Sequence, residues 1–252
     1  MSCAIFAQNF YMTSKKGVLY LIPTPLAEGP VENSLPEVVL AQIPKLRYFV
    51  VEELRTARRF LSQAGLKGQI DGLWLRELNE HTAPEALQEL LQPLLDGEDL
   101  GLLSEAGLPA VADPGAGLVA LAQQRGIQVV PLVGPSSLML ALMASGMNGQ
   151  NFAFVGYLPV SSQERRARLK QLERRAATEA QTQLFIETPY RNLSLFQDIL
   201  ESCGSATRLC IAANLTAPEG FVQTKTVAQW HKEPAPPIHK VPTVFVLEAR
   251  CV

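Results

Sequence analysis

The sequence predicts an α/β protein with two α/β domains, and this prediction rests chiefly on residues 101–142. Two apolar runs, residues 100–103 and 127–133, each lead into a turn rich in glycine and proline and then into a helix-like segment. Such a repeated strand-turn-helix pattern predicts parallel strands, with the turns at the carboxyl edge where α/β sheets bind ligands. We therefore expect the turns SEAGLPAVADPG and VGPSS to contact a ligand.

The first domain is expected to cover residues 17–149, with residues 1–16 as an N-terminal extension. Short apolar runs predict five strands, at residues 17–22, 48–51, 73–78, 100–103 and 127–133. Apolar periodicity predicts helices at residues 34–42, 52–63 and 82–95 between them. Ser34, followed by a proline and a glutamate, is the predicted N-cap of the first helix. The second helix carries an apolar stripe on one face and arginines on the other.

The second domain is expected to cover residues 150–252, because the composition changes after Gly149. Its predicted strands are residues 152–157, 184–187, 208–214, 221–227 and 243–248, which would form a mixed sheet. A strongly basic amphipathic helix is predicted at residues 162–177 and a second amphipathic helix at 192–203. The linker at residues 148–151 is short, so we expect the two domains to pack closely.

Composition places limits on the partners of this chain. The formal net charge of -2 gives no overall nucleic-acid signature, although local basic patches can still bind RNA. Four cysteines without CxxC spacing fit a reduced, cytoplasmic protein. The N-terminus is not a signal peptide and no run is apolar enough to cross a bilayer. The three histidines lack the spacing of metal ligands, so no metal is expected.

Several motifs have a structural and a functional interpretation. GAGLVA at residues 115–120 matches a dinucleotide fingerprint, but no strand immediately precedes it and no acidic residue lies about 20 residues further on, so a nicotinamide cofactor is disfavoured. Glu52 and Glu53 are favourable charges at a helix N-terminus or, alternatively, carboxylates that position a substrate or accept its proton. The arginine faces of residues 55–59 and 165–175 are solvated surfaces or, alternatively, phosphate contacts.

Read together, seven segments resemble the tetrapyrrole-methylase superfamily of S-adenosylmethionine-dependent methyltransferases. The family's PTP turn, its CEDTRHTRKLL and SDAGTPLISDPG segments and its PLPGP turn correspond to residues 19–25, 51–61, 104–115 and 131–135. In the second half, FxFxGxLP, YExPHR and ELTK-like elements correspond to residues 152–159, 186–191 and 214–216. The order and extent resemble most the RsmI-like branch, which methylates a ribose 2'-hydroxyl of a cytidine in small-subunit ribosomal RNA.

The chain departs from that family at polar positions expected to face the substrate. The departures are Glu53 for aspartate, Leu54 for threonine, Thr56 for histidine, Tyr190 for histidine and Ala217 for lysine. The turns expected to hold the cofactor are retained. This pattern resembles a divergent, shorter paralogue of the ribosomal RNA enzyme.

The resemblance implies S-adenosylmethionine as cofactor, in a cleft between the two domains. It implies these cofactor-binding residues: Pro23, Glu105, Ala106, Gly107, Pro109, Val111, Gly134, Pro135, Ser136, Glu187, Ala213, Asn214 and Leu215. Glu53, with Arg55 beside it, is the candidate to orient the acceptor or accept its proton. Arg58, Arg59, Tyr190 and Arg191 are the candidate substrate contacts.

The resemblance also implies a cytoplasmic homodimer that acts on ribosomal RNA or the small ribosomal subunit, without a membrane partner. Two alternatives remain at this point. One is methylation of a tetrapyrrole or another small molecule, and the other is a non-catalytic protein that binds S-adenosylmethionine.

Overall fold

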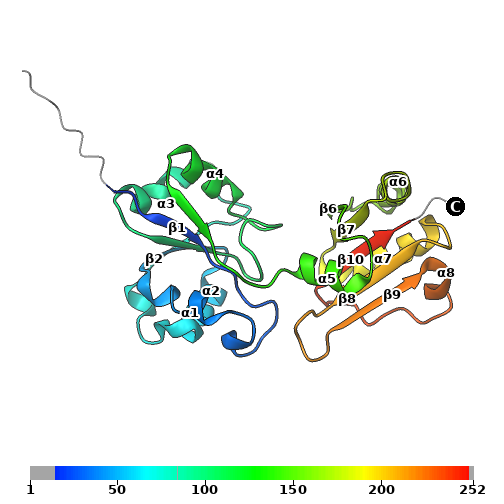
Figure 1. Ribbon diagram of the computed structural model, residues 1–252, viewed down its shortest axis with the longest axis horizontal. Helices are drawn as coiled ribbons and strands as arrows, with labels where there is room; N and C mark the ends of the chain where they lie inside the picture. The colour runs from blue at the N-terminus through cyan, green and yellow to red at the C-terminus, as the bar shows by residue number, and fades with distance from the viewer. Residues whose placement is uncertain (1–14, 84, 250–252) are drawn as a thin grey trace, which may run out of the picture. The chain divides into compact units, whose positions relative to one another are not determined.

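The computed structural model describes residues 15–83 and 85–249, which fold into two compact units (Figure 1). The first unit holds the described residues up to Pro23 together with Leu35–Val133. The second holds Thr24–Ser34 and the chain from Gly134 onward. Most of the expected N-terminal extension lies outside the described residues. Among the described residues, no helix has the length and apolarity needed to cross a membrane.

The first unit contains a five-stranded parallel sheet in the order β3-β2-β4-β1-β5. Its strands are β1 (Val18–Leu21), β2 (Tyr48–Val51), β3 (Trp74–Glu77), β4 (Leu100–Leu103) and β5 (Gln128–Pro131). All five were predicted to within two residues at each end, because each is a short apolar run ended by turn residues. Leu21 pairs with both Leu102 and Pro131, so three of these strands end at one edge.

The helices of the first unit are α1 (Glu37–Leu40), α2 (Leu54–Leu61), α3 (Ala86–Leu95) and α4 (Ala116–Gln124). Shorter helical turns are η2 (Ile43–Lys45), η3 (Ser62–Leu66, a π turn) and η4 (Ile70–Gly72). Leucines of α3 and α4 form a core with the sheet, for example Leu91 and Leu118 with Leu19 and Leu100. These helices therefore share one buried core with the first sheet.

The prediction that Ser34 is the N-cap of the first helix is wrong. Helix α1 begins only at Glu37, with Pro36 in the N-cap position and no side-chain cap. The physical reason is the proline, because the residue before a proline is driven out of the helical region. Residues 31–33 form a separate turn, η1 (Val31–Asn33), and belong with the second unit.

The second unit contains a mixed sheet in the order β6-β7-β10-β8-β9. Its strands are β6 (Phe152–Tyr157), β7 (Thr182–Ile186), β8 (Arg208–Ala213), β9 (Phe221–Thr226) and β10 (Thr243–Glu248). β6 and β7 are parallel, whereas β10 is antiparallel to β7 and to β8. Ile186 and Ala212 both pair with Val244, so β7 and β8 run in the same direction and end at one edge.

The helices of the second unit are α5 (Ser137–Ser145), α6 (Ser162–Glu179), α7 (Asn192–Ser202) and α8 (Val227–Trp230), with a turn η5 (Pro189–Arg191). Helix α5 packs Leu138 and Leu142 against Leu184 and Val246 of the second sheet. The compact units therefore divide between Val133 and Gly134, whereas the sequence places the boundary near residues 149–151. The apolar face of α5 decides this, because it is buried on the second sheet.

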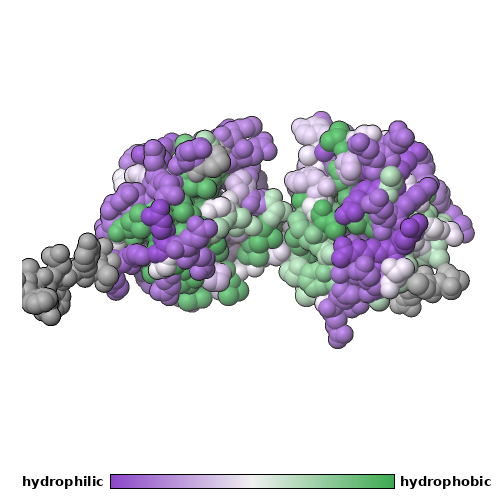
Figure 2. Space-filling model, turned by 90° about the horizontal axis from the view of Figure 1, so that it is seen from above, coloured by the Kyte–Doolittle hydropathy of each residue, from purple (hydrophilic) through white to green (hydrophobic). Residues whose placement is uncertain are grey.

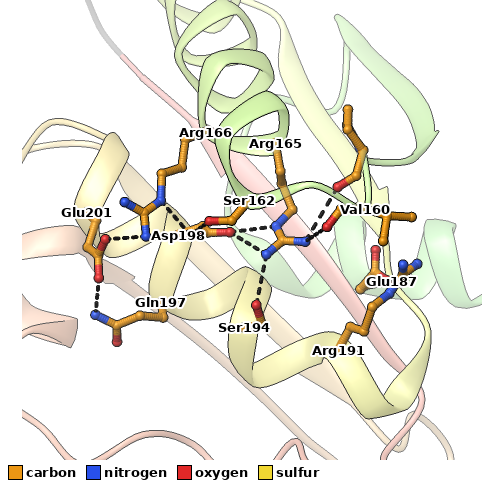
Figure 3. A network of polar contacts seen from close by, with 11 residues as sticks. Val160, Ser162, Arg165, Arg166, Glu187, Arg191, Ser194, Gln197, Asp198 and Glu201 are labelled. Atoms are coloured by element: carbon orange, nitrogen blue, oxygen red, sulfur yellow. Dashed lines mark hydrogen bonds and ion pairs between the residues drawn. The ribbon is translucent and has the colours of Figure 1, made fainter.

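Helices α6 and α7 are joined by a buried ion pair (Figure 3). Arg165 is 2% exposed and donates from Nε to Asp198 Oδ2 at 2.6 Å. The same guanidinium donates to Ser194 Oγ at 2.8 Å and to the Val160 carbonyl at 3.0 Å. Arg166 reaches the other oxygen of Asp198 at 2.6 Å. Part of the basic helix predicted from the sequence is therefore internal structure, and not a solvated face.

The described cysteines, Cys203 and Cys210, are buried free thiols. Burial raises the pKa of the Cys203 thiol to about 12. A thiol with such a pKa stays protonated and unreactive near neutral pH. Both residues therefore serve the core, as the sequence suggests, while Cys3 and Cys251 lie outside the described residues.

Candidate functional site

The carboxyl edge of the first sheet gathers the predicted residues of that unit. Pro23 follows β1, Glu52 follows β2 and Glu105 lies in the turn after β4. The backbone N–H of Glu105 donates to Glu52 Oε2 at 3.0 Å, which ties the turn after β4 to the end of β2. The prediction that the turn SEAGLPAVADPG stands at a ligand-binding edge is consistent with this arrangement.

This turn is held in an unusual backbone conformation. Gly107 has a φ of 81°, and two residues with side chains, Ala110 and Ala112, have φ values of 65° and 63°. A left-handed conformation costs energy for residues other than glycine and is concentrated at sites that position ligands. Between the two alanines, Val111 is 44% exposed. The turn therefore presents the expected cofactor contacts on a strained, fixed backbone.

Glu53 has a local structural role. Both of its carboxylate oxygens accept backbone N–H groups at the start of α2, from Arg55 at 2.9 Å and Thr56 at 2.7 Å. These two bonds hold the pKa of Glu53 below its usual value. A carboxylate that is already paired with two amides and has a lowered pKa is a weak proton acceptor. The capping interpretation thus accounts for Glu53 better than the catalytic one does.

Other carboxylates at the same edge have the opposite tendency. Burial, followed by repulsion from Glu52, raises the pKa of Asp113 to about 6, although a hydrogen bond with Ser104 opposes the shift. Burial and the charges of Glu52 and Glu53 also raise the pKa of Glu105. Carboxyl groups with raised pKa values can accept a proton near neutral pH. Glu105 is among the predicted cofactor contacts, whereas Asp113 is not, because its only signal in the sequence is its place in the glycine-proline turn.

The carboxyl edge of the second sheet presents Glu187. Its side chain is 0% exposed and is paired with Nε of Arg191, one helical turn further on (Figure 3). The Thr188 hydroxyl donates to Glu187 Oε1 at 3.3 Å. The other oxygen, Oε2, is buried and has no hydrogen-bond partner among the described residues. Such an acceptor is costly unless a ligand or water supplies a donor.

Two further predicted residues lie at this edge. Ala213 is the last residue of β8 and pairs with Thr243 of β10. The next residue of β10, Val244, pairs with Ile186 at the end of β7. Two strand spacings separate β7 from β8, so Glu187 and Ala213 lie about 10 Å apart. Asn214 follows with a φ of 48° and donates from Nδ2 to Glu219 Oε1 at 3.1 Å. Leu215 comes next and packs on the same core cluster as α5.

The comparisons with known proteins add relatives over most of the chain, although no family model matches. The chain is 31% identical to "Ribosomal RNA small subunit methyltransferase I" of Vibrio cholerae over 213 residues, which cover 84% of this chain and 69% of the relative. The protein of the same name from Escherichia coli O157:H7 is 30% identical over 224 residues, 87% of this chain and 74% of its own length. This chain belongs to the tetrapyrrole-methylase superfamily of S-adenosylmethionine-dependent methyltransferases.

Solved structures of that superfamily share the fold of this methyltransferase homologue. The methyltransferase CobJ has a TM-score of 0.60 and 16% identity, with 95% of this chain and 97% of CobJ covered. The cobalt precorrin-4 methyltransferase CbiF has a TM-score of 0.57 and 13% identity, with 92% and 94% covered. At such low identity these structures support the two-sheet α/β fold and nothing finer.

One residue at which this chain differs from the family motif, Tyr190, lies close in sequence to Glu187. Tyr190, in the position of a family histidine, is 71% exposed, and Lys240 Nζ lies 5.4 Å from its ring centroid. Arg191, a predicted substrate contact, is instead engaged by Glu187. Arg55, Arg58 and Arg59 are exposed on α2, as their sequence spacing predicts. Among residues 15–83 and 85–249, no group of histidine, cysteine or acidic side chains is placed to hold a metal ion.

The remaining predicted cofactor residues lie at the start of the second unit. Ser136 is the N-cap of α5 and accepts the N–H of Met139 at 3.4 Å. Gly134 and Pro135 precede it and follow β5, the last strand of the first sheet. The turn VGPSS is thus the covalent connection from the ligand edge of one sheet to a helix of the next unit.

Proposed function

We propose that this chain transfers a methyl group from S-adenosylmethionine to small-subunit ribosomal RNA, at the ribose 2'-hydroxyl of a cytidine. The relatives from V. cholerae and E. coli, both named "Ribosomal RNA small subunit methyltransferase I", support the choice of acceptor. Glu187 carries the proposal that S-adenosylmethionine binds here, because its buried Oε2 has no hydrogen-bond donor among the described residues. The ammonium and hydroxyl groups of S-adenosylmethionine are donors of the kind that this oxygen requires.

The donor-binding residues come from both units in this proposal. Backbone groups of the strained turn after β4 supply donors and acceptors that side-chain changes leave in place. The implied set is Pro23, Glu105, Ala106, Gly107, Pro109, Val111, Gly134, Pro135, Ser136, Glu187, Ala213, Asn214 and Leu215. Bound S-adenosylmethionine supplies a methyl group already activated on a sulfonium, so the protein needs mainly to align the acceptor and exclude water.

The acceptor hydroxyl must lose a proton during transfer. We assign the proton acceptor to Asp113, supported by Glu105, because burial and neighbouring charge give these carboxyl groups raised pKa values. Glu53 then fixes the start of α2, and this positions Arg55 beside the acidic edge. Arg55, Arg58 and Arg59 present an exposed basic face that fits RNA phosphates.

A cytoplasmic homodimer completes the proposal. A ribosomal RNA substrate implies the cytoplasm of a bacterium, the source of the named relatives. Exposed apolar side chains, including Val133 at 71% and Met143 at 76%, offer surface that a second copy can cover. Light scattering coupled to size-exclusion chromatography measures this state, and a single species of monomer mass at micromolar concentration would remove the dimer.

The decisive experiment is methyl incorporation from labelled S-adenosylmethionine. Small ribosomal subunits from a strain lacking the cytidine mark are expected to be labelled, and nuclease mapping should locate the label on one ribose. Calorimetry with S-adenosylmethionine alone tests donor binding separately. Donor binding without label on subunits or naked RNA overturns the acceptor, and transfer to a tetrapyrrole replaces it. No donor binding overturns the enzymatic proposal as a whole.

A further inference from the structure

Two groups of cations on helix α6 differ in their ion pairing. Arg165 and Arg166 are paired with Asp198, and Arg175 donates to Glu179 at 3.0 Å. Lys170 and Arg174 are exposed and have no ion-pair partner among the described residues. These two residues are one helical turn apart, so they stand on the same face of the helix. The structural role of the first group therefore does not extend to the second.

Lys170 and Arg174 line a groove of about 770 Å³ beside the end of α7. Its other walls come from Ser202 at the end of α7, from the loop that connects α7 to β8, including Ser205, and from the end of β10. Helix α6 lies at the top of the second unit in Figure 1, and the view from above in Figure 2 shows a largely hydrophilic surface on this unit.

The carboxylates of the groove are already engaged. Glu173 accepts the N–H of Gly204 at 2.6 Å and the Thr207 hydroxyl. Glu248 accepts from Arg208 at 2.8 Å. The groove thus offers two unpaired cations, and its acids are held by the protein.

The hollow surface continues along the helix. A second depression of about 490 Å³ is lined by Ser162, Gln163, Arg166 and Ala167, and Lys170 lines both depressions. A small anion needs one enclosed pocket, whereas two open depressions that share a lysine form a track. A track with cations one turn apart suits the successive phosphates of a polymer.

We propose that this α6 groove, from Ser162 to Arg174, binds the phosphate backbone of the RNA substrate. The proposal rests on the proposed function and adds a contact site remote from the methyl-transfer edge. Arg208 at the groove is five residues before Ala213 on the same strand, which places the two about 17 Å apart. Only a substrate of several nucleotides spans that distance. Backbone contacts of this kind fix register without reading bases.

The test compares K170A/R174A with the matched double variant R175A/K232A. The control removes two exposed cations from the same unit, neither of which lines the groove. Binding of a ribosomal RNA fragment is measured by fluorescence anisotropy between 50 and 200 mM KCl. The slope of log K against log[KCl] is negative, and each lost phosphate contact reduces its magnitude by about 0.7–0.9. The magnitude for K170A/R174A should therefore fall by about 1.4–1.8, and the control should keep the wild-type slope.

Calorimetry with S-adenosylmethionine should give the wild-type affinity for both variants and thereby show that the fold is intact. A wild-type slope for K170A/R174A overturns the α6 groove and leaves the proposed function standing. If K170A/R174A shows the expected loss of slope but the wild-type protein methylates no RNA, the proposed function is overturned and the α6 groove stands. An equal slope loss in the control also overturns the groove, because it attributes the effect to net charge.

Discussion

At the scale of single residues, Glu53 separates capping from catalysis. E53A removes the acceptor of two α2 amides and should lower the free energy of unfolding. E53N should keep the cap and most of that stability, because asparagine is among the best N-cap residues. Urea unfolding measures both effects, and we expect E53N to retain methyl transfer.

The same pair of variants can contradict this view of Glu53. If E53N unfolds like the wild type but loses more than about 100-fold in kcat, the carboxylate itself takes part in the reaction. That result would restore the role that the sequence analysis assigned to it and would remove Asp113 as the sole proton acceptor.

Asp113 gives a prediction with two pH-dependent readouts. Its pKa is raised to about 6, so the folded chain binds its proton more tightly than the unfolded chain does. Stability contributed by this group is therefore present below about pH 4 and is lost as pH rises to about 6. D113N should remove that slope and stabilise the chain at pH 7.

Activity should depend on Asp113 in the opposite direction. A proton acceptor works only when deprotonated, so kcat of the wild type should fall as pH drops below about 6. D113N should lower kcat and abolish that limb of the profile, as measured in single-turnover methyl transfer between pH 5 and 8. An unchanged limb in D113N would show that another group titrates.

The sequence indicates which residues follow strands but not which side chains they pair with. Glu105 and Glu187 are cofactor contacts implied by the family resemblance, and both follow strands of the structure. Arg191 was expected to face a substrate, but its spacing to Glu187 allows an ion pair that a list of residue types cannot reveal. Likewise, no pattern signals that Ala110 takes a left-handed conformation, because surrounding packing imposes it.

At the scale of elements, the junction of α6 and α7 depends on the buried pair Arg165–Asp198. D198A leaves the buried Arg165 charge unpaired and should cost about 3–5 kcal/mol. R165A leaves Asp198 paired with Arg166 and should cost less than D198A, whereas R175A removes an exposed pair and should cost less than about 1 kcal/mol. The double variant R165M/D198L should recover most of the loss, since an apolar pair leaves no charge unsatisfied. Guanidinium unfolding of the four variants measures this.

The outcome that would contradict this prediction is a loss of similar size for D198A and R175A. Such equality would mean that the unpaired buried charge does not set the stability of this junction. A double variant no better than D198A would mean that the hydrogen bonds to Ser194 and Val160, and not the charge pairing, dominate.

The elements themselves were largely predictable, for a physical reason. Buried strands are short apolar runs between turns, and the amphipathic helices carry their apolar stripe in the sequence. The exceptions lie where tertiary contacts overrule local pattern: α1 starts late after Pro36, and α2 ends in the π turn Ser62–Leu66. The basic run 162–177 gave a correct helix, but the sequence could not tell which arginines pair internally.

At the scale of the whole molecule, two sheets were predicted but their division was not. The sheets are contiguous blocks of sequence, so alternation of strands and helices reveals both. The division depends on which sheet buries α5, and an apolar helix near a connection gives no sign of its partner. Residues 24–34 likewise group with the second unit although the chain around them belongs to the first.

The proposed contacts with S-adenosylmethionine come from residues of both units and lead to a prediction for amide hydrogen exchange. Saturating S-adenosylmethionine should slow amide hydrogen exchange in two separate segments, residues 104–111 and 213–215. A ligand at 100 times its Kd can slow exchange that requires its release by about 100-fold, or about 2.7 kcal/mol. Exchange mass spectrometry should therefore show protection in both segments at one common ligand concentration.

E187Q sharpens this prediction, because it keeps the shape of the side chain and removes the charge of the acceptor Oε2. Loss of a charge-assisted hydrogen bond should weaken donor binding by about 10–100-fold and shift the protection of both segments by the same factor. One ligand that contacts both units requires this equality. Protection confined to residues 104–111, unaffected by E187Q, would place the donor on the first unit alone and would leave Glu187 a purely structural partner of Arg191.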